Sequence, residues 1–396
     1  MDTQPTGATG HGFSAQAFSA GLLAAFVGFA SSFAVIIQGL TAVGASQQEA
    51  ASGLMALSIA MGLCGILLSF KTRQPISIAW STPGAALLAS TAAPEGGFAV
   101  AVGAFLVSSL LIIIAGLWKP LGRAVAAIPA PLANAMLAGV LLHLCLAPVE
   151  AVADSPVLGL AIVLTWALVA KWRRLLAVPA AVIVTVIIIA LTVDVSHLDV
   201  TALWPQPIWV MPQFTPAAVV GIALPLFIVT MASQNIPGIA VLNVNGYRPD
   251  PGPLFSVTGL FSLLAAPFGG HAVNLAAITA ALCAGHDAHP DPARRYWAAA
   301  ASGAFYVLFG LAAGAATAFI SAAPPILIQA VAGLALLGAL GSAMLGAVAE
   351  AKDREAAIIT FIVTASGFSF FGISGAFWGL LAGGAVYALT HWRVQR

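Results

Sequence analysis

The scarcity of charged residues is the feature that most constrains this chain. Of its 396 residues, 61% are hydrophobic and only 7% are Asp, Glu, Lys or Arg, whereas soluble globular domains contain about 25% of these charged residues. Apolar runs long enough to cross a bilayer as helices recur from about residue 18 to residue 389. The sequence therefore predicts one polytopic membrane domain. Its first apolar helix lacks a cleavage-like flank, which argues against a removed signal peptide.

The positions of the basic residues predict the topology. All 14 Lys and Arg fall into seven clusters, and the turns between clusters carry acids or no charge. If the clusters face the cytoplasm, as the positive-inside rule expects, each pair of segments crosses outwards and returns. The result is fourteen segments with both termini in the cytoplasm, at about residues 18–43, 51–70, 75–92, 98–118, 124–147, 156–170, 175–193, 215–243, 253–267, 268–285, 293–320, 324–349, 355–371 and 374–392.

Two of these segments differ from plain helices. The third begins QPISIAW at 74–80, a short β-branched alternation, and reads as a helix only from STPG at 81–84. The tenth places AAPFGGH at 265–271 before a helical run from Ala272 to Leu282. Each pattern predicts extended backbone followed by a half-helix, which is tolerated at membrane depth only when it is buried in protein or lines a cavity. Broken spans at corresponding places in two halves indicate a transporter's binding site.

The two halves of the chain also correspond in sequence. PLANAMLAG, at 131–139 in the fifth segment, aligns with PILIQAVAG, at 325–333 in the twelfth, and Gln38 in the first segment lies opposite Gln234 in the eighth. Because seven is odd, the second half must enter the membrane from the opposite side. The predicted fold is therefore all-α with a 7+7 inverted repeat, in which short extended strands lead into half-helices in segments 3 and 10.

The half-helices predict a way to bind an anion without a cationic side chain. Every Asp, Glu, Lys and Arg is assigned to a loop or a span end, so no fixed charge remains at membrane depth. Free N–H groups and the positive end of the helix dipole form an anion site at a helix N-terminus. Ser81 or Thr82 is the predicted N-cap of the first half-helix, with Gly84 in its first turn. Gly269 and Gly270 allow a ligand to approach the second backbone closely.

The stretch MASQNIPG, from Met231 to Gly238, places polar side chains inside the eighth segment. Gln234 and Asn235 offer amide donors and acceptors that orient a ligand without charge, and Pro237 frees a backbone carbonyl. Interhelical hydrogen bonding is the alternative, since Asn and Gln commonly join membrane helices. We favour ligand contact because the two amides stand together in a Pro-interrupted span.

Two histidines are the proton-binding groups left at membrane depth. His271 stands at the predicted start of the second half-helix, where ligand contact or proton coupling competes evenly with a capped, packed imidazole. Asn274 follows it by three residues on the same predicted helical face. His143 has only Leu and Cys neighbours, so we interpret it as a satisfied core histidine. Trp80 is positioned either to stack on an aromatic substrate or to pack in the core, and we weigh the two equally. For Phe33, Met231 and Phe268 we favour plain packing, with an apolar pocket wall as the alternative.

Several function classes find no support in the sequence. There is no GxSxG, no HExxH and no pair of intramembrane carboxylates, so we expect no enzyme. The cysteines Cys64, Cys145 and Cys283 stand apart in apolar runs without CxxC or His pairing, which predicts buried thiols and neither a metal site nor a cofactor. A net charge of +1 excludes a polybasic surface for nucleic acid. A passive anion channel stays open, because it can use the same half-helix site.

Three motifs together resemble the BenE-type benzoate/proton symporters of bacteria. They are ISIAWSTPGAALL at 76–88, TMASQNIPGIAVL at 230–242 and APFGGHAVNLAAITAA at 266–281, and the resemblance covers nearly the full chain. That family is similar in architecture to the uracil permease and sulfate permease transporters. The resemblance implies a multi-pass protein of the bacterial inner membrane that takes up an aromatic carboxylate with protons. It is also compatible with a homodimer, since many such transporters are dimers.

The resemblance further implies two domains that slide past each other. A tail (1–17) precedes a core domain (18–120 and 215–322) and a gate domain (121–196 and 323–396), with substrate held between the third and tenth half-helices. Uracil permeases place glutamates in segments eight and ten, where this chain has Gln234 and, approximately, His271. This departure suggests that an acidic ligand replaces an acidic protein group.

The resulting hypothesis has benzoate or a relative with its carboxylate at the backbone of 82–84 and 270–272 and its ring near Trp80 and Met231. Gln38, Gln234 and Asn235 fix its orientation in this scheme. The proton enters on His271 or on the substrate carboxylate itself. A nucleobase or inorganic-anion transporter of the same fold is the nearest alternative.

Overall fold

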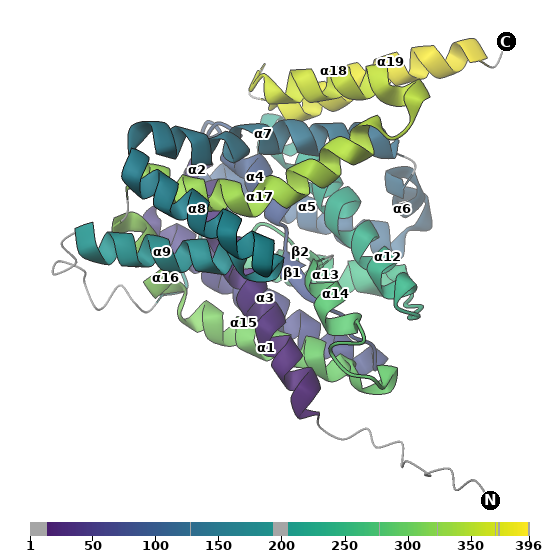
Figure 1. The fold of residues 1–396 in the computed structure, drawn as a ribbon. Helices are drawn as coiled ribbons and strands as arrows, with labels where there is room; N and C mark the ends of the chain where they lie inside the picture. The colour runs from purple at the N-terminus through teal and green to yellow at the C-terminus, as the bar shows by residue number, and fades with distance from the viewer. Residues whose placement is uncertain are drawn as a thin grey trace, which may run out of the picture.

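The computed structural model describes residues 14–126, 128–192, 205–276, 278–322, 324–368, 370 and 373–394, and this part of the chain is predominantly helical. Its first half contains α1 (Ala15–Ala30), α2 (Phe33–Ala42), α3 (Gln47–Thr72), β1 (Ile78–Trp80), α4 (Thr82–Ala89), α5 (Phe98–Leu117), α6 (Lys119–Ala126), α7 (Ala130–Asp154), α8 (Pro156–Trp172), the 3₁₀ turn η1 (Arg174–Leu176) and α9 (Ala177–Thr192). Figure 1 shows α7, α17, α18 and α19 towards one side of the molecule and α1, α3 and α15 towards the other.

The second half of the chain is also helical, and several of its helices are short. It contains α10 (Pro216–Ala218), the π-helix η4 (Val219–Ala223), α11 (Leu224–Thr230), the π-helix η5 (Met231–Asn235), α12 (Ile236–Val244), α13 (Pro251–Ala265), η6 (Ala266–Phe268), β2 (Val273–Leu275), α14 (Ile278–Ala284), η7 (Pro292–Arg294), α15 (Tyr296–Leu311), α16 (Ala313–Ala322), α17 (Pro325–Val348), η8 (Ala351–Asp353), α18 (Arg354–Ala365) and α19 (Gly375–Val394). The predicted tail (1–17) lies outside the described residues up to residue 13, and α1 already begins at Ala15.

Eight helical stretches within the described residues are long and apolar enough to cross a bilayer. They are Ala15–Ala42, Gln47–Thr72, Phe98–Leu117, Ala130–Asp154, Arg174–Thr192, Pro216–Val244, Pro251–Phe268 and Pro325–Val348, and Pro156–Trp172 is a shorter apolar helix. The helical, membrane-type character of the chain is thus confirmed. The count of fourteen crossings and the 7+7 repeat stay predictions, because several of the expected crossings are short or broken helices.

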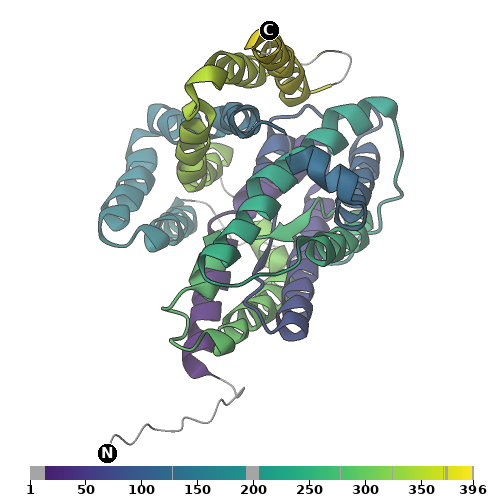
Figure 2. The same ribbon diagram turned by 90° about the vertical axis from the view of Figure 1, so that its right-hand side faces the viewer.

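The two broken spans meet as a pair of short antiparallel strands. Residue Ile78 pairs with Leu275, Ala79 with Asn274 and Trp80 with Val273. Two flanking hydrogen bonds extend the pairing, from Ser81 N to Ala272 O and from Ala276 N to Ser77 O, each 3.0 Å long. Strands whose paired residues are 193 to 197 positions apart in sequence thereby satisfy each other's backbone groups in the interior, where Figure 2 shows them surrounded by helices.

We call the two strands and their half-helices the first arm (78–89) and the second arm (273–284, of which residue 277 lies outside the described residues). The strand and half-helix of the first arm follow the prediction closely, since β1 ends at Trp80 and α4 begins at Thr82. The second arm corrects it. The run predicted as a helix from Ala272 instead contains β2, and the helix begins only at Ile278.

Helices from the two halves of the chain pack closely on each other. Helix α7 packs along α17, and α3 packs along α15. Where α3 and α15 cross, a methyl group on Gly62 or on Gly303 would collide with the carbonyl oxygen of the other glycine. Small residues thus let these two backbones touch, as is common between membrane helices.

Candidate functional site

A cavity of about 180 Å³ lies beside the strand pair, where both arms face α1, α15 and α17. Its lining residues are Val27, Gly28, Ser31, Ser32, Met61, Ala79, Trp80, Thr82, Pro83, Gln234, Ala276, Thr279, Tyr306, Ala335, Leu336, Gly338 and Ala339. None of these side chains carries a formal charge at neutral pH. The polar groups that face this central cavity are hydroxyls, one amide and one indole N–H, so any ligand is held by hydrogen bonds and apolar contact.

Trp80 forms one fixed wall of the cavity. Its Nε1–H donates to Ser32 Oγ at 2.8 Å, and its ring packs against Phe29 at a centroid distance of 5.4 Å. Ser32 stands at the break between α1 and α2. The indole N–H is therefore committed to the protein, and only the ring face of Trp80 is available to a ligand.

The start of α4 offers fewer anion donors than its position suggests. Ser81 is the N-cap: its Oγ accepts from Gly84 N at 3.1 Å, and its carbonyl accepts from Ala85 N at 2.8 Å. Pro83 has no N–H to give. Thr82 is the residue of this turn whose amide and hydroxyl have no hydrogen-bond partner in the described part of the chain. The predicted anion site at 82–84 is thereby reduced to Thr82.

Gln234 belongs to the π-helix η5, which the proline after it helps to explain. Pro237 cannot donate to the carbonyl four residues earlier, and the chain widens into a π-turn over Met231–Asn235. The same arrangement recurs at η4, followed by Pro225, and there Ser374 Oγ donates to the freed Gly221 carbonyl at 3.0 Å. Gln234 lines the central cavity, and its side-chain amide hydrogen-bonds to no described residue.

Asn235 makes contacts within the protein, whereas the adjacent Gln234 lines the central cavity. Its Oδ1 accepts from Leu275 N at 2.9 Å, and its Nδ2 lies 3.2 Å from Met231 Sδ. The side chain is fully buried and is absent from the lining of the central cavity. Asn235 therefore anchors β2 to the eighth segment, and direct substrate contact by Asn235 or Met231 stays a prediction.

The glycines before β2 do not reach the central cavity. Gly269 N donates to Ala266 O, and Gly270 N donates to Ala265 O, so both amides are used locally. Gly269, with φ of +92°, packs on the backbone of Glu49 and Gly53 in α3. The predicted half-helix start at 270–272 is wrong, because β2 intervenes. From the second arm, Ala276 and Thr279 line the cavity instead.

His271 is fully buried behind the strand pair. Its Nε2 lies 2.9 Å from Ser81 O, its ring meets Phe105 edge-on, and its Nδ1 has no partner among the described residues. The expectation that it opens a helix is wrong, and so is the helical face assigned to Asn274, which lies in β2 opposite Ala79. Both amide atoms of Asn274 are buried without a described partner. His271 reaches the central cavity only through the Ser81 backbone.

The remaining predicted residues lie near the site without lining it. Gln38 is half-buried in α2 and its Oε1 has no described partner. Gly84 is in contact with Leu226 and with its own cap, Ser81. The cavity residues Ser31, Ser32, Thr279 and Tyr306 were not predicted from the sequence. The adjacent serines within an apolar run were a usable signal, and so was Tyr306, since the chain has only four tyrosines.

A second cavity of about 450 Å³ lies at the other end of α4. It is lined by Ala89, Ser90, Thr91, Ala92, Gly139, Val140, His143, Thr364, Gly367, Ser374, Gly375 and Ala376. The interpretation of His143 as a core residue is wrong, because its side chain is exposed to this space. Its Nε2 lies 2.8 Å from Ala365 O, at the C-terminal end of α18. This second cavity therefore lies between α4 on one side and α7, α18 and α19 on the other.

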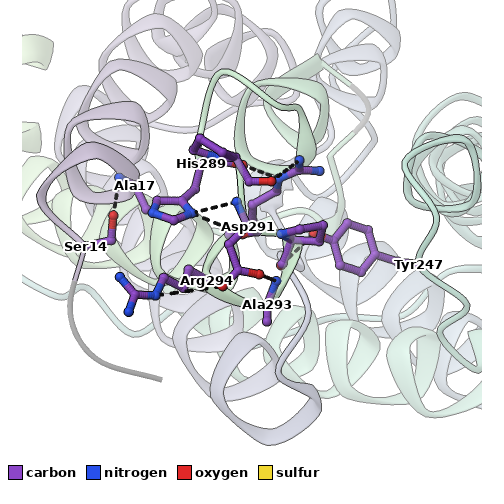
Figure 3. A network of polar contacts seen from close by, with 10 residues as sticks. Ser14, Ala17, Tyr247, His289, Asp291, Ala293 and Arg294 are labelled. Carbon is purple, nitrogen blue, oxygen red and sulfur yellow. Dashed lines mark hydrogen bonds and ion pairs between the residues drawn. The ribbon is translucent and has the colours of Figure 1, made fainter. Parts of the chain in front are cut away.

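Polar groups also gather in the loop after α14, away from both cavities (Figure 3). Tyr247 Oη donates to Pro292 O at 2.9 Å, and Asp291 N donates to His289 Nδ1 at 3.0 Å. Burial raises the pKa of Tyr247 above its usual value. The buried Arg295 donates to Ala284 O at 2.9 Å, which closes the end of α14. We interpret this cluster as structural. No group of three His, Cys, Asp or Glu suited to a metal ion occurs among the described residues.

The chain is similar in sequence to known membrane proteins. Residues 12–389 match the family described as BenE: Benzoate membrane transport protein. Inner membrane protein YdcO of Escherichia coli (strain K12) is 41% identical over 372 residues, 94% of this chain and 95% of the relative. A benzoate membrane transport protein of Acinetobacter baylyi (strain ATCC 33305 / BD413 / ADP1) is 32% identical over 375 residues, 95% of each chain.

Solved structures share the fold at low identity. The transmembrane domain of the cyanobacterial bicarbonate transporter BicA superimposes with a TM-score of 0.61 at 17% identity, over 93% of this chain and 97% of that domain. The murine anion transporter Slc26a9 in its inward-facing state gives a TM-score of 0.62 at 12% identity, over 95% of this chain and 68% of its own. The chain therefore has the membrane fold of these anion transporters.

Proposed function

Because this chain belongs to the BenE benzoate membrane transport family, and is thus a membrane transport protein and not an enzyme, we propose that it takes up benzoate or a related aromatic carboxylate together with protons. The observation that carries the proposal is the uncharged central cavity beside the strand pair, which is lined by Thr82 and Gln234, two residues whose donors have no hydrogen-bond partner among the described residues. We propose that it acts in the bacterial inner membrane with both termini in the cytoplasm, and that it forms a homodimer.

In this proposal the carboxylate accepts hydrogen bonds from the amide and hydroxyl of Thr82 and from the side-chain amide of Gln234. These donors supply what a carboxylate needs without a buried cation, and the adjoining α4 N-terminus adds a favourable dipole. The aromatic ring lies against Trp80, Met61 and Leu336, which offer apolar surface in the same cavity. Benzoate, which has one apolar ring and one carboxylate, matches this division of the cavity wall into apolar and polar parts.

The absence of a fixed charge in the cavity lining supports proton coupling in this proposal. A lone anion at membrane depth costs several kcal/mol, and a proton that lowers the net charge of the loaded state would reduce this cost. The substrate carboxylate itself can carry this proton, and so can His271, whose Nδ1 has no partner among the described residues and whose Nε2 contacts the Ser81 carbonyl next to Thr82. We retain both carriers in the proposal.

The location of the central cavity supports movement of one domain against another. Its lining comes from α1, the two arms, η5 and α15 in the predicted core (18–120 and 215–322), and from α17 in the predicted gate (121–196 and 323–396). A substrate bound there touches both domains. Neutralising the substrate would let the core slide past the gate and expose the site on the other side.

Uptake of radiolabelled benzoate into proteoliposomes tests the proposal directly. We expect accumulation only with an inward proton gradient, and its loss in Gln234→Ala. Asn245→Ala is a matched control, because its amide bonds to Val241 O within its own helix. Equilibration without accumulation would indicate a passive channel. Absence of benzoate uptake, with uptake of uracil, sulfate or bicarbonate, would refute the aromatic substrate.

A second experiment separates the two proton carriers. We expect His271→Gln to retain benzoate exchange across the membrane but to lose accumulation driven by the proton gradient, if His271 carries the proton. Unchanged accumulation in this variant would leave the substrate carboxylate as the carrier.

A further inference from the structure

Gly338 leaves open space on the α17 side of the central cavity. It lies in the middle of α17 and lines the cavity, and a methyl group built on it would have no described atom within 4 Å. Two other glycines of the same helix differ. A methyl group on Gly333 would collide with the Leu144 carbonyl oxygen in α7, and one on Gly346 would collide with the Asn134 side chain. Those glycines allow close helix packing, whereas Gly338 touches no other helix in this way.

A glycine without a packing contact is unfavourable in the middle of a helix. Among the common residues only proline is worse in a helix interior, and alanine is the best. Alanine would fit at position 338 without a clash, so neither helix formation nor helix packing accounts for Gly338. What the glycine does provide is space, and that space belongs to the central cavity.

The α17 wall of the cavity offers only apolar contact. Its lining residues are Ala335, Leu336, Gly338 and Ala339. The donors that the proposed function assigns to the carboxylate, Thr82 and Gln234, lie outside α17, in the predicted core. A ligand that is bound through these donors therefore meets α17 with its ring or with a group on the ring.

The size of the cavity allows more than an unsubstituted ring. A closed apolar cavity of about 150 Å³ is enough to hold benzene. The central cavity is larger, at about 180 Å³, and Gly338 in its wall is exposed. The space at Gly338 can therefore receive a small apolar group on the ring, whereas a polar group would find no side-chain partner on α17.

We infer that Gly338 is a specificity-determining residue, and that the space beside it takes a small apolar ring substituent, such as a methyl group or a halogen, of an aromatic carboxylate. The substituent stands meta or para to the carboxylate, because an ortho group would lie beside the carboxylate and its donors. The inference rests on the proposed function, since it takes the carboxylate site at Thr82 and Gln234 as given.

Competition against radiolabelled benzoate bound to the purified protein tests this inference. We expect the wild-type protein to bind 3-methylbenzoate or 4-methylbenzoate at least as tightly as benzoate, because the methyl group enters unoccupied apolar space. Gly338→Ala fills part of this space. It should weaken binding of that methylbenzoate about fivefold or more, the effect of forcing one extra methyl group into a filled site, and should weaken benzoate binding much less.

Gly341→Ala is the matched control. Gly341 lies about one turn further along α17, a methyl group on it would also have no described atom within 4 Å, and it is absent from the lining of the central cavity. Both variants should unfold at a temperature no lower than that of the wild-type protein, because alanine favours a helix. The ratio of methylbenzoate to benzoate affinity should change only in Gly338→Ala.

Three results overturn the inference. They are rejection of both methylbenzoates by the wild-type protein, an unchanged affinity ratio in Gly338→Ala, and an equal change of the ratio in Gly341→Ala. In each of these cases benzoate still binds the wild-type protein, so the proposed function stands. If no aromatic carboxylate binds the wild-type protein, the proposed function itself fails.

Discussion

The two arms of the strand pair reach the same cavity by different means. In the first arm, Ser81 caps its own helix and places Thr82 at the cavity one residue later. In the second arm, β2 is held by side chains from other segments, since Asn235 and Ser262 accept hydrogen bonds from Leu275 N and Val273 N. The first arm is thus organised locally and presents free donors, whereas the second is organised by its neighbours and mainly completes the wall.

The largest effect should come from removing the donor that only the first arm offers. Thr82→Val should raise the KM for benzoate by about tenfold or more, since a hydrogen bond to a charged group contributes about 1.5–3 kcal/mol. Thr279→Val in the second arm is the matched control and should change KM much less, because the Thr279 hydroxyl is already paired with Ser77. Equal effects in a proteoliposome uptake assay would mean that both arms bind the carboxylate.

The second arm should be the more sensitive one when stability is measured. Asn235→Ala leaves the buried Leu275 N–H without its acceptor, and an orphaned donor costs about 1–3 kcal/mol. We expect a corresponding loss in the free energy of unfolding of the purified protein in detergent. Asn245→Ala should change it little, because that amide only bonds back to Val241 O. An unchanged unfolding curve for Asn235→Ala would show that β2 does not depend on this bond.

The same contrast explains what the sequence could reveal. The Ser-Thr-Pro-Gly run at 81–84 carries its own cap and proline signal, so both the strand and the helix start of the first arm were predictable from adjacent residues. The run from Ala272 has no such local signal, and its apolar, alanine-rich composition suits a helix. Its strand exists because β1, Asn235 and Ser262 supply partners across the fold, which no local pattern encodes.

The residues of the candidate site show the same contrast between local sequence signals and long-range packing. Trp80, Thr82 and Gln234 were predicted from motifs and do line the central cavity. Tyr306 and Thr279 line it because of how α15 and α14 pack, and His271 lies behind the strands because β2 displaced the helix start by six residues. Residues next to a local signal could be assigned, whereas those brought in by packing could not.

Removing the N-cap side chain of Ser81 should lower the free energy of unfolding less than removing the Asn235 side chain, which anchors β2 from another segment. Ser81→Ala removes the acceptor for Gly84 N, and loss of an N-cap side chain costs about 1 kcal/mol. We expect the free energy of unfolding to fall by about this amount, with benzoate KM rising because Thr82 is less well placed. A loss greater than that of Asn235→Ala under the same conditions would reverse the ranking of the two arms.

The smallest effect should come from the side-chain hydrogen bond that joins the cap of the first arm to the end of α11. Thr230 Oγ1 donates to Ser81 Oγ at 3.0 Å, and Thr230→Val should destabilise the protein by about 0.5–1 kcal/mol. Because both substitutions act on Ser81 Oγ, the double variant Ser81→Ala with Thr230→Val should lose less than the two single losses added together. Strict additivity in the unfolding measurements would show that Thr230 supports some other contact. A non-additive result would mean that Thr230 stabilises the first arm only through the Ser81 cap, as expected for an arm that is organised by its own residues.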